Sequence, residues 1–540
     1  MSCRCKKEEV RSMMEEVRVM MRKILFLIIS MVAVLPMKAQ DDVKAAGAAI
    51  DTIIRVFPNY EIVDKFVADI FKKNEKSAYL AARIGKAYYN YVMVPGNPTP
   101  QFHRRDVAKA FEYLEKAIAI DPKYPDTYLV ASDIFFNEAK IDTALIWLDK
   151  GIAANPTDSS LYIESAKLLA FTDPDAAVEK LMTLKQRDST FQVDLQLGRL
   201  YYKLYSDHGK LPMKEMAESY GKVYDSPDRG KMNLGDLGAY SLGLQWAGDL
   251  GEERFAKLYE ATAYGLERFP KDFGLHHFHL LGCMNTQKWD EGIKTMDAMQ
   301  VMPDSVKKMT GDDYLWYASC LGGAKRYDDA ISVYERVTNM DIATATNKTQ
   351  AESAIVRTIN TQVTELRQMG DYEKAIAIVE PALQRSRDKG NQNDQLVSSY
   401  AKIYTDWSVE LNGTEKQDAI AKAVQIYEDG AKYSELNKGL FLYFCCSYSG
   451  AYLDPKFEKG AGLPYAEQLI ALLGNKADLS NSDKAYLVQA YRYMMMYEYL
   501  NKFAVQKIKK SKAVALDYAD KILDVDPTNA DALNFVSKVN

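Results

Sequence analysis

Three of the five histidines in the chain lie in one short stretch, GLHHFHLLG, at His276, His277 and His279. Imidazole is a common metal ligand and a common general base. On a helix, His276 and His279 share a face, whereas His277 points about 100° away, so at most two of the three could bind one ion. Cys283 lies one helical turn beyond His279. The stretch therefore predicts a weak metal site at His276 and His279, or simple packing of the rings within a helix.

Motifs that carry catalysis in many enzymes are missing from the sequence. It holds no G-x-x-x-x-G-K-[ST] phosphate loop, no H-E-x-x-H, no G-x-S-x-G, and no G-x-G-x-x-G at the start of a helix. Each of these patterns places a nucleophile, a metal ligand or a phosphate-binding backbone where its chemistry needs it. We therefore expect no enzymatic activity and no cofactor.

Composition and net charge indicate a folded protein that does not bind nucleic acid. The chain has 540 residues, of which 47% are hydrophobic and 26% charged, as expected for several folded domains or one long array. After residue 40 it carries 61 Lys and Arg against 70 Asp and Glu. A nucleic-acid binder needs a basic surface, so the charge argues against nucleic acid as a partner.

The first forty residues read as a targeting region. Met21, Arg22 and Lys23 precede a 14-residue apolar run at 24–37, which is shorter than the roughly 20 residues that span a bilayer. We interpret 21–40 as a signal peptide cleaved near Ala39/Gln40, and 1–20 as an upstream extension from a mis-assigned start. The predicted location is the periplasm or the cell envelope, with no stable transmembrane span after cleavage. An uncleaved anchor is the alternative.

Most of the chain after residue 77 shows a repeated sequence pattern rather than catalytic motifs. Residues 110–122 read AFEYLEKAIAIDP, and residues 144–156, one 34-residue step later, read ALIWLDKGIAANP. Small residues at 110 and 117, or at 144 and 151, lie on one helix face and let a neighbouring helix approach closely. A proline then ends each segment, because the residue before proline avoids the helical conformation. Another amphipathic segment, such as 78–91 or 126–140, precedes each of them.

This pattern resembles the tetratricopeptide repeat (TPR). The first segment has the form aromatic-x-x-[LI]-[GA]-x-x-[YF], and the second has alanine, a large apolar residue, alanine or glycine, and proline. Partial copies recur at 315–340, 370–383 and 518–527. The resemblance implies an all-α, helix-turn-helix solenoid wound as a right-handed superhelix, with about ten or eleven helix pairs and a capping helix at each end.

Domain boundaries are expected where the pattern weakens. The predicted parts are a capping helix pair at 41–76, an N-terminal TPR array at 77–228, a central TPR-like array at 229–390, a C-terminal TPR-like array at 391–527 and a capping helix at 528–540. The glycine-rich stretch 226–251 is expected to be a hinge and 453–464 a weak joint. We expect no strands, and we read 92–105 as an insertion between two helices. Cys283 and Cys320 are expected to be buried apolar residues, although a disulfide between them stays open.

The resemblance also implies where a partner would bind. In a TPR solenoid the first helices line a concave groove, whose side chains are free of packing. The register of the repeat assigns the following residues to that groove: Tyr79, Lys86, Tyr89, Asn90, Asp133, Phe136, Asn137, Lys167, Arg199, Tyr202 and Lys203. Tyr89, Phe136 and Tyr202 are the predicted aromatic anchors.

Two modes of recognition fit these residues. The lysines, asparagines and arginine among them are similar in type to the clamp with which some TPR proteins hold a peptide carboxylate. The other mode is a generic groove for an extended or helical peptide. The predicted function is a non-catalytic interaction scaffold of the bacterial cell envelope, with another envelope protein or peptide as partner. The alternatives are a glycan- or solute-associated binding protein and, third, a metal-binding protein or enzyme centred on His276 and His279.

Overall fold

The computed structural model describes residues 40–56, 60–93, 99–187, 191–208 and 212–539. The predicted upstream extension, and all of the predicted signal peptide except its last residue, lie outside these ranges. Among the described residues, no helix combines the length and the apolar character needed to cross a bilayer. Within these ranges the chain divides into two compact units, which we call unit 1 (up to Pro270) and unit 2 (from Lys271).

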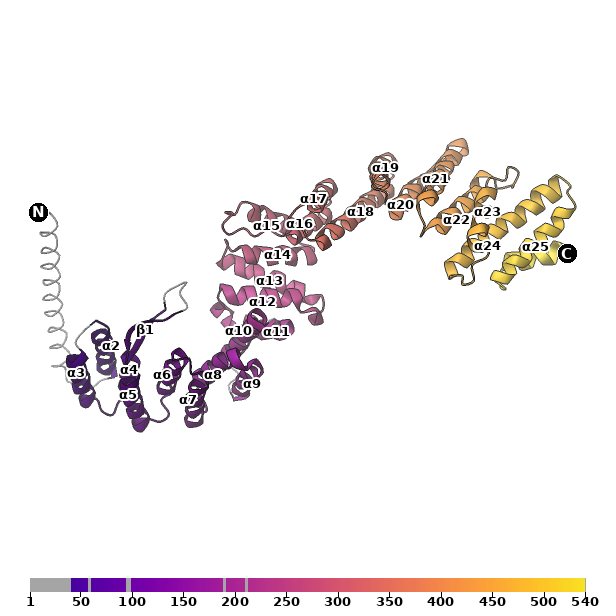
Figure 1. Ribbon diagram of the computed structural model, residues 1–540. Coiled ribbons are helices and arrows are strands. Elements are labelled where there is room, and N and C mark those ends of the chain that lie inside the picture. Colours follow the sequence, from indigo (N-terminus) through magenta and orange to yellow (C-terminus); the bar gives the residue numbers. More distant parts are fainter. Residues whose placement is uncertain (1–39, 57–59, 94–98, 188–190, 209–211, 540) are drawn as a thin grey trace, which may run out of the picture. The chain divides into compact units, whose positions relative to one another are not determined.

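Unit 1 is a succession of short helices with one small sheet (Figure 1). Its elements are α2 Gln40–Val56, α3 Tyr60–Lys73, α4 Ala78–Tyr88, β1 Tyr89–Val92, β2 Gln101–Arg105, α5 Val107–Ile120, α6 Pro125–Asn137, α7 Ile141–Ala154, α8 Ser159–Thr172, α9 Pro174–Arg187, α10 Phe191–His208, α11 Met213–Tyr224, the 3-10 turn η1 Pro227–Lys231, α12 Leu234–Trp246, the 3-10 turn η2 Gly248–Leu250 and α13 Glu253–Arg268.

The described residues of unit 2 form helices joined by loops, with no strand among them (Figure 1). Its elements are α14 Phe273–Asn285, α15 Trp289–Gln300, α16 Gly311–Gly323, α17 Tyr327–Asn339, α18 Ala345–Gln368, α19 Tyr372–Asp388, α20 Asp394–Glu410, α21 Gly413–Tyr433, α22 Lys438–Tyr448, the π-helical turn η3 Ser449–Leu453, α23 Leu463–Leu473, α24 Asn481–Met496, the π-helical segment η4 Tyr497–Val505, α25 Lys510–Val525 and α26 Ala530–Val539.

The helices pack as consecutive pairs. Over the described residues, α4 to α25 form eleven pairs, α4 with α5 through α24 with α25, each helix packed on its partner. First helices also contact the first helices of the next pairs: α4, α6, α8, α10 and α12 form such a row in unit 1. A single pair cannot bury its apolar face, so each pair is stabilised by its neighbours. The predicted all-α solenoid of ten or eleven pairs is therefore confirmed.

Side-chain size sets the close approach within each pair. Ala144, Leu148 and Gly151, on the second helix of the α6–α7 pair, are fully buried. A methyl group at Gly151 would lie 2.8 Å from Cγ of Tyr128 on α6, closer than real carbon atoms approach one another. The ring of Tyr128 thus occupies the space that a side chain at 151 would take. The repeated small residue is a packing requirement.

One expectation about unit 1 is wrong, because the segment read as an insertion contains strands. β1 and β2 form an antiparallel hairpin that pairs Tyr89 with Arg105 and Tyr91 with Phe102, with a register shift between Asn90 and Tyr91. The rings of Tyr89, Tyr91 and Phe102 lie against one another, with Tyr89 and Phe102 centroids 5.1 Å apart. These aromatic contacts stabilise a two-stranded sheet that would be marginal alone. The alternation of aromatic residues at 89 and 91 was the available signal.

The glycine-rich stretches are more regular than expected. Within 226–251, α12 is a complete helix whose N-terminus is held by a capping box between Asn233 and Asp236. The two compact units divide at Pro270, inside the range expected for the central array. The expected weak joint at 453–464 is a hydrogen-bonded loop around Asp454, whose buried carboxylate accepts four backbone N–H groups. Glycine in both stretches permits turns and close contacts, and neighbouring side chains then fix them.

Candidate binding cavity

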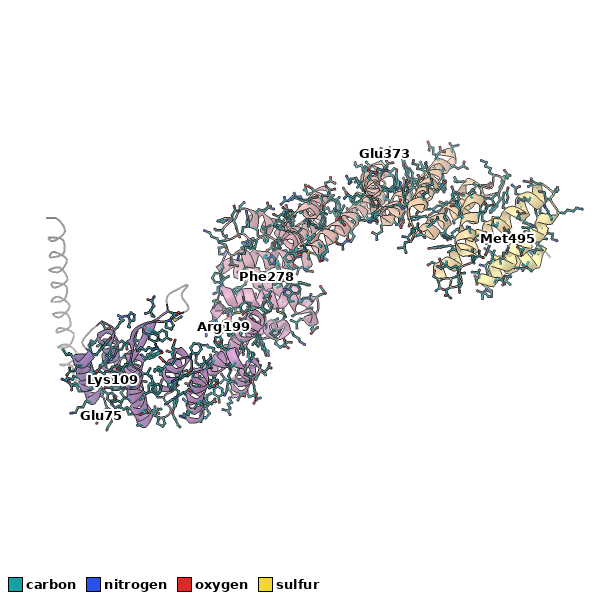
Figure 2. All side chains as sticks on the ribbon, in the orientation of Figure 1. Glu75, Lys109, Arg199, Phe278, Glu373 and Met495 are labelled. Atoms are coloured by element: carbon teal, nitrogen blue, oxygen red, sulfur yellow. The ribbon has the colours of Figure 1, made fainter. Side chains whose placement is uncertain are left out.

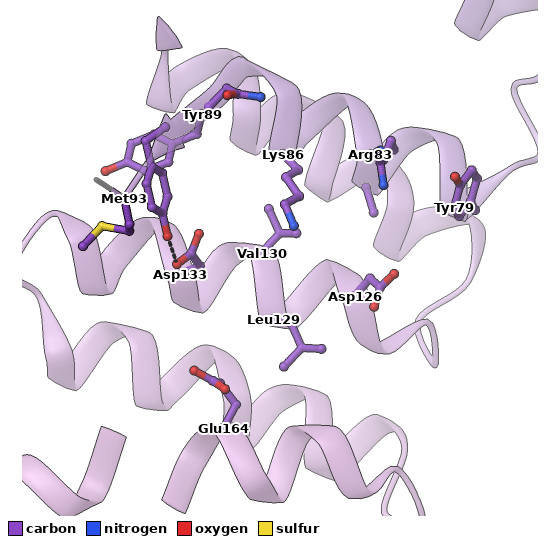
Figure 3. Close-up of a pocket in the computed structure, with 13 residues that line it drawn as sticks. Tyr79, Arg83, Lys86, Tyr89, Met93, Asp126, Leu129, Val130, Asp133 and Glu164 are labelled. Carbon is purple, nitrogen blue, oxygen red and sulfur yellow. Dashed lines mark hydrogen bonds between the residues drawn. The ribbon is translucent and has the colours of Figure 1, made fainter. Parts of the chain in front are cut away.

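A cavity of about 610 Å³ opens among α4, β1, α6 and α8 of unit 1 (Figure 3). Five residues that the sequence assigned to the groove line it: Tyr79, Lys86, Tyr89, Asn90 and Asp133. The other lining residues are Ala82, Arg83, Tyr91, Met93, Asp126, Leu129, Val130 and Glu164. Its wall is mixed, with aromatic and aliphatic surface beside three carboxylates and two cations.

Helical periodicity brings these residues to one face. On α4, residues 79, 82, 83 and 86 are spaced by three or four, as are 126, 129, 130 and 133 on α6. The start of α4 is fixed by Ser77, whose hydroxyl accepts from the Leu80 backbone N–H at 3.1 Å. Because α4 and α6 are neighbouring first helices, their exposed faces meet across the cavity.

The hairpin forms one wall and is anchored by two acidic residues. Glu138 accepts from Arg105 Nε and Nη2, each at 2.7 Å, and from the Tyr89 hydroxyl at 2.8 Å. Asp64 accepts from the Tyr88 hydroxyl at 2.8 Å and from Arg104 at 3.0 Å, and it also pairs with Lys109.

Both carboxylates are more acidic than usual. Hydrogen bonds from Arg105 and then Tyr89 lower the pKa of Glu138. Burial opposes the shift at Asp64, but hydrogen bonds from Lys109, Tyr88 and Arg104 lower its pKa overall. The ammonium of Lys109, labelled in Figure 2, thus belongs to the anchor of the hairpin. Charged hydrogen bonds to Glu138 and Asp64 therefore hold the hairpin in place.

The Glu138 anchor predicts a pH dependence. A carboxyl group with a lowered pKa stabilises the fold above its unfolded pKa of about 4.3, and that stability is lost as pH falls through the folded value. Glu138→Gln should therefore lower the melting temperature at pH 7, and the difference from the wild type should be smaller at pH 3. Melting curves of the full chain at both values measure this. Glu112→Gln, in an exposed i,i+4 pair with Lys116, is the control and should change little. An equal deficit at both pH values would contradict the anchor.

Carboxylates dominate the electrostatics of the cavity. Burial raises the pKa of Asp133, against hydrogen bonds from the Tyr91 hydroxyl at 2.7 Å and Asn137 Nδ2 at 3.1 Å. Arg83 points toward the cavity but is neutralised by Asp51, to which its Nε donates at 2.7 Å. The positive charge of the nearby Lys86 opposes this rise in the pKa of Asp133. Glu164 pairs with Lys167 outside the cavity lining, and the two remaining carboxylates, Asp126 and Asp133, exceed the single charge of Lys86.

Comparisons with known proteins agree with the repeat. The sequence profile of the tetratricopeptide repeat matches residues 102–166. That match spans β2, α5, α6, α7 and most of α8, the same segment that holds the echoed sequences and one side of the cavity. The chain therefore contains tetratricopeptide repeats, and its matched segment lies at 102–166.

Solved structures similar to this TPR protein are also repeat proteins. The C-terminal part of a TPR repeat-containing protein from Cytophaga hutchinsonii is 16% identical, covering 54% of this chain and 98% of that one, with a TM-score of 0.31. A TPR protein from Parabacteroides merdae is 13% identical, covering 45% and 90%, with a TM-score of 0.25. The TPR domain of P58(IPK) is 14% identical, covering 72% and 93%, with a TM-score of 0.20. No curated protein matches the sequence.

Three predicted groove residues of the TPR protein lie outside the cavity lining or have packing roles. Tyr89 was expected as an exposed anchor, but it begins β1, is only 2% exposed and donates to Glu138. Asn137 does not line the cavity; its Nδ2 donates to the Asp133 carbonyl at 2.8 Å and to the Asp133 carboxylate at 3.1 Å. Phe136 remains exposed, and its ring lies 6.1 Å from that of Phe171 on α8.

Three of the predicted cations line a second, smaller hollow of about 250 Å³ between α8 and α10: Lys167, Arg199 and Lys203. Arg199, labelled in Figure 2, makes a bidentate pair with Asp236, both bonds measuring 2.8 Å. Lys203 lies over the Phe171 ring at 4.0 Å, and Lys167 pairs with Glu164 at 2.9 Å.

The remaining predicted groove residue on α10, Tyr202, is exposed, and its ring lies 6.4 Å from that of Tyr205. The cations of the second hollow already have acidic or aromatic partners within the TPR protein. A carboxylate clamp, which needs several cations converging on the ligand, is therefore not favoured here.

The histidine stretch lies on α14 in unit 2. His276 and His279 are buried, as packing predicts, and His277 Nδ1 lies 2.7 Å from the Asp313 carboxylate. The predicted pairing of His276 with His279 is not what the fold assembles among the described residues. His279 instead lies with Cys283 and with Glu291 from α15. Cys283 and Cys320 are both buried free thiols, so no disulfide joins them.

Sequence reasoning missed several residues of the cavity. Tyr91 and Met93 line the cavity because the chain continues from α4 into strand β1. The helical spacing of the repeat does not predict the positions of residues in a strand. Arg83 and Glu164 lie three residues before Lys86 and Lys167, which were assigned to the groove. The alternation Tyr-Asn-Tyr was the signal for the first two, whereas the last two needed the exact rotation of α4 and α8 about their axes.

Proposed function

We propose that this TPR protein is a non-catalytic scaffold of the bacterial cell envelope whose unit 1 cavity binds an extended or helical segment of a partner protein. Repeat arrays of this kind commonly present concave surfaces for protein partners. The apolar run and basic residues at 21–40 support export, as argued from the sequence. The observation that carries the proposal is the cavity itself, where neighbouring first helices leave polar, aromatic and aliphatic side chains facing one open space.

The chemistry of the cavity selects the kind of segment. Tyr79, Leu129 and Val130 offer apolar surface, and Asp126, Asp133 and Glu164 offer negative charge (Figure 3). The best complement is a lysine or arginine flanked by apolar side chains, because its cation would pair with carboxylates while its neighbours bury area. Asp133 gains most from such a partner, since its charge is partly desolvated.

Site-specific photo-cross-linking tests this proposal. A photoreactive residue replaces Leu129 in the cavity or, as the matched control, Ile146, which is exposed on the second helix α7. Each full-length variant is incubated with an envelope fraction, and the bound segment is identified by mass spectrometry. We expect one segment, containing lysine or arginine, to be linked from 129 and not from 146. Equal linking from both positions would contradict the cavity as the binding site.

The charge requirement is tested separately with the identified segment as a synthetic peptide. Asp133→Asn and Glu164→Gln keep the shapes of the side chains and remove two charges. We expect the double variant to bind about 10- to 100-fold more weakly, because a hydrogen bond to a charged group contributes roughly 1.5–3 kcal/mol. Asp149→Asn, on α7 and paired with Lys180, is the control. Unchanged affinity in the double variant would exclude a cation-selective cavity.

A further inference from the structure

Three potential metal ligands meet in unit 2, far along the chain from the cavity. They are His279 and Cys283 on α14 and Glu291 on α15, and one ligand atom from each lies within 4.8 Å of the other two. His279 Nε2 and a carboxylate oxygen of Glu291 are 3.2 Å apart. His279 is 3% exposed and Cys283 is fully buried, whereas Glu291 is half-buried.

Helix geometry explains the grouping. His279 and Cys283 are four residues apart, which places them on the same face of α14 one turn from each other. The α14–α15 turn is tight, since the Lys288 backbone N–H donates to the Cys283 carbonyl at 2.9 Å. Gly292 then allows α15 to approach: a methyl group there would lie 3.3 Å from Cβ of Cys283 and 2.5 Å from Sγ of Cys320. Glu291, the residue before it, is thereby brought beside His279.

The donor set fits a particular class of ion. Imidazole nitrogen, thiolate sulfur and carboxylate oxygen are the three ligand types that Zn²⁺ takes, at about 2.0–2.3 Å. Ligand atoms around a tetrahedral ion of that size lie roughly 3.5 Å apart. The His279–Glu291 separation of 3.2 Å is already close to this value, and a ligand atom of Cys283 lies within 4.8 Å of both partners. Hard cations such as Mg²⁺ and Ca²⁺ prefer all-oxygen sites and do not match.

We propose that His279, Cys283 and Glu291 bind one borderline divalent cation of the Zn²⁺ type, with a water molecule as the fourth ligand. The ion would enter past Glu291, the exposed member of the three. Binding forms the metal–sulfur bond and releases the thiol proton to solvent.

Neighbouring residues supply the controls. Cys320 is a second buried thiol that, like Cys283, lies against Gly292, but it is outside the three-residue group. His277 is engaged with Asp313 and lies outside the group as well. Cys320→Ser and Cys283→Ser are equally conservative changes of buried thiols, but only the second removes a proposed ligand.

The test uses the purified, reduced full chain, stripped with a chelator and dialysed against Zn²⁺ or Co²⁺. We expect one ion per chain by elemental analysis, and with Co²⁺ the near-ultraviolet absorption of a cobalt–thiolate bond. Cys283→Ser should abolish that absorption, Glu291→Gln should weaken binding at least 10-fold, and Cys320→Ser should retain both. Zn²⁺ should also raise the melting temperature of the wild type and of Cys320→Ser, but not that of Cys283→Ser.

Two results would overturn the proposal. One is a chain that retains no Zn²⁺ or Co²⁺ after dialysis, although its helical circular dichroism is intact. The other is binding that survives unchanged in Cys283→Ser, which would place the ion elsewhere. Because the variants are compared through both metal content and melting temperature, a misfolded Cys283→Ser chain is recognised by its melting curve in the absence of metal. Glu291→Gln, a change at the surface, then carries the test.

Discussion

Replacing Asp454 by alanine is expected to cost about 3–5 kcal/mol of local stability in unit 2. The Asp454 side chain is buried, and its carboxylate accepts from the backbone N–H groups of Glu458 at 2.8 Å, Lys459 at 3.0 Å, Gly460 at 2.7 Å and Ala461 at 3.3 Å. Alanine would leave these four donors without their acceptor. An unsatisfied buried donor costs about 1–3 kcal/mol, although some of the four would regain water.

The surrounding loop amplifies this effect. Asn501 on η4 donates to the carbonyls of Phe457 at 2.7 Å and Glu458 at 2.8 Å, and the Gly462 N–H donates to the Tyr493 hydroxyl at 2.8 Å. The loop therefore connects η3 and α23 to α24 and η4. Its loss would loosen the packing between two successive pairs, and in a repeat protein such a loss stays close to its origin.

Hydrogen exchange of the full chain measures the Asp454 prediction. The amides of 458–461 should exchange about 100- to 4,000-fold faster in Asp454→Ala, because each factor of ten corresponds to about 1.4 kcal/mol. Asp454→Asn should show a smaller increase, since its amide oxygen replaces one carboxylate oxygen and its NH₂ group cannot accept. Asp478→Ala, at an exposed position in the same unit, is the control. Unchanged protection in Asp454→Ala would show that the loop does not depend on the carboxylate.

Asp236→Ala should be the most damaging single charge removal in unit 1, at about 2–4 kcal/mol. Asp236 is 3% exposed, accepts two bonds from Arg199, and completes the capping box of α12 by accepting from the Asn233 N–H at 3.0 Å. Loss of a cap costs about 1 kcal/mol, and breaking a buried pair costs more. The total is below that for a fully buried pair because the Arg199 side chain is 39% exposed and would turn to water.

Calorimetric melting of the single and double variants tests this pair. Asp236→Ala and Arg199→Ala should be non-additive, with a coupling of about 1–3 kcal/mol, because each removes the same interaction. Asp228→Ala, whose carboxylate makes only an exposed i,i+3 pair with Lys231, should stay within about 0.5 kcal/mol of the wild type. If Arg199→Ala left stability unchanged and instead abolished binding of a peptide carboxylate, Arg199 would belong to a clamp rather than to the framework.

The repeat itself was readable from the sequence because its information is local. Ala144, Leu148 and Gly151 recur at helical spacing, and the small residues mark where a neighbouring helix comes close. Such a pattern predicts helix pairs wherever it occurs, so the eleven pairs of the described chain followed from it. Five of the thirteen residues that line the cavity followed as well, since the first helix of a pair presents every third or fourth residue to the concave side.

The hairpin was missed because its stability comes from contacts made outside it. Four residues of β1 and five of β2 carry no lasting alternation, and Tyr91 is held by Asp133 across the cavity, 42 positions along the chain. Whether a segment forms a strand depends on contacts with distant residues more than helix formation does. The wall that the hairpin adds is therefore a product of tertiary packing.

By itself, the sequence determined the class of fold, the size and spacing of the repeated unit, and the face of each helix that packs, because these depend on side-chain size at fixed local intervals. The tertiary structure alone decided how the polar residues are used. Arg199 is taken up by Asp236, 37 residues away, and His279 joins Glu291 rather than His276. Lys86 and Asp133 face the open cavity. A charged side chain acts through whichever partner lies within about 4 Å, and folding decides which partner that is.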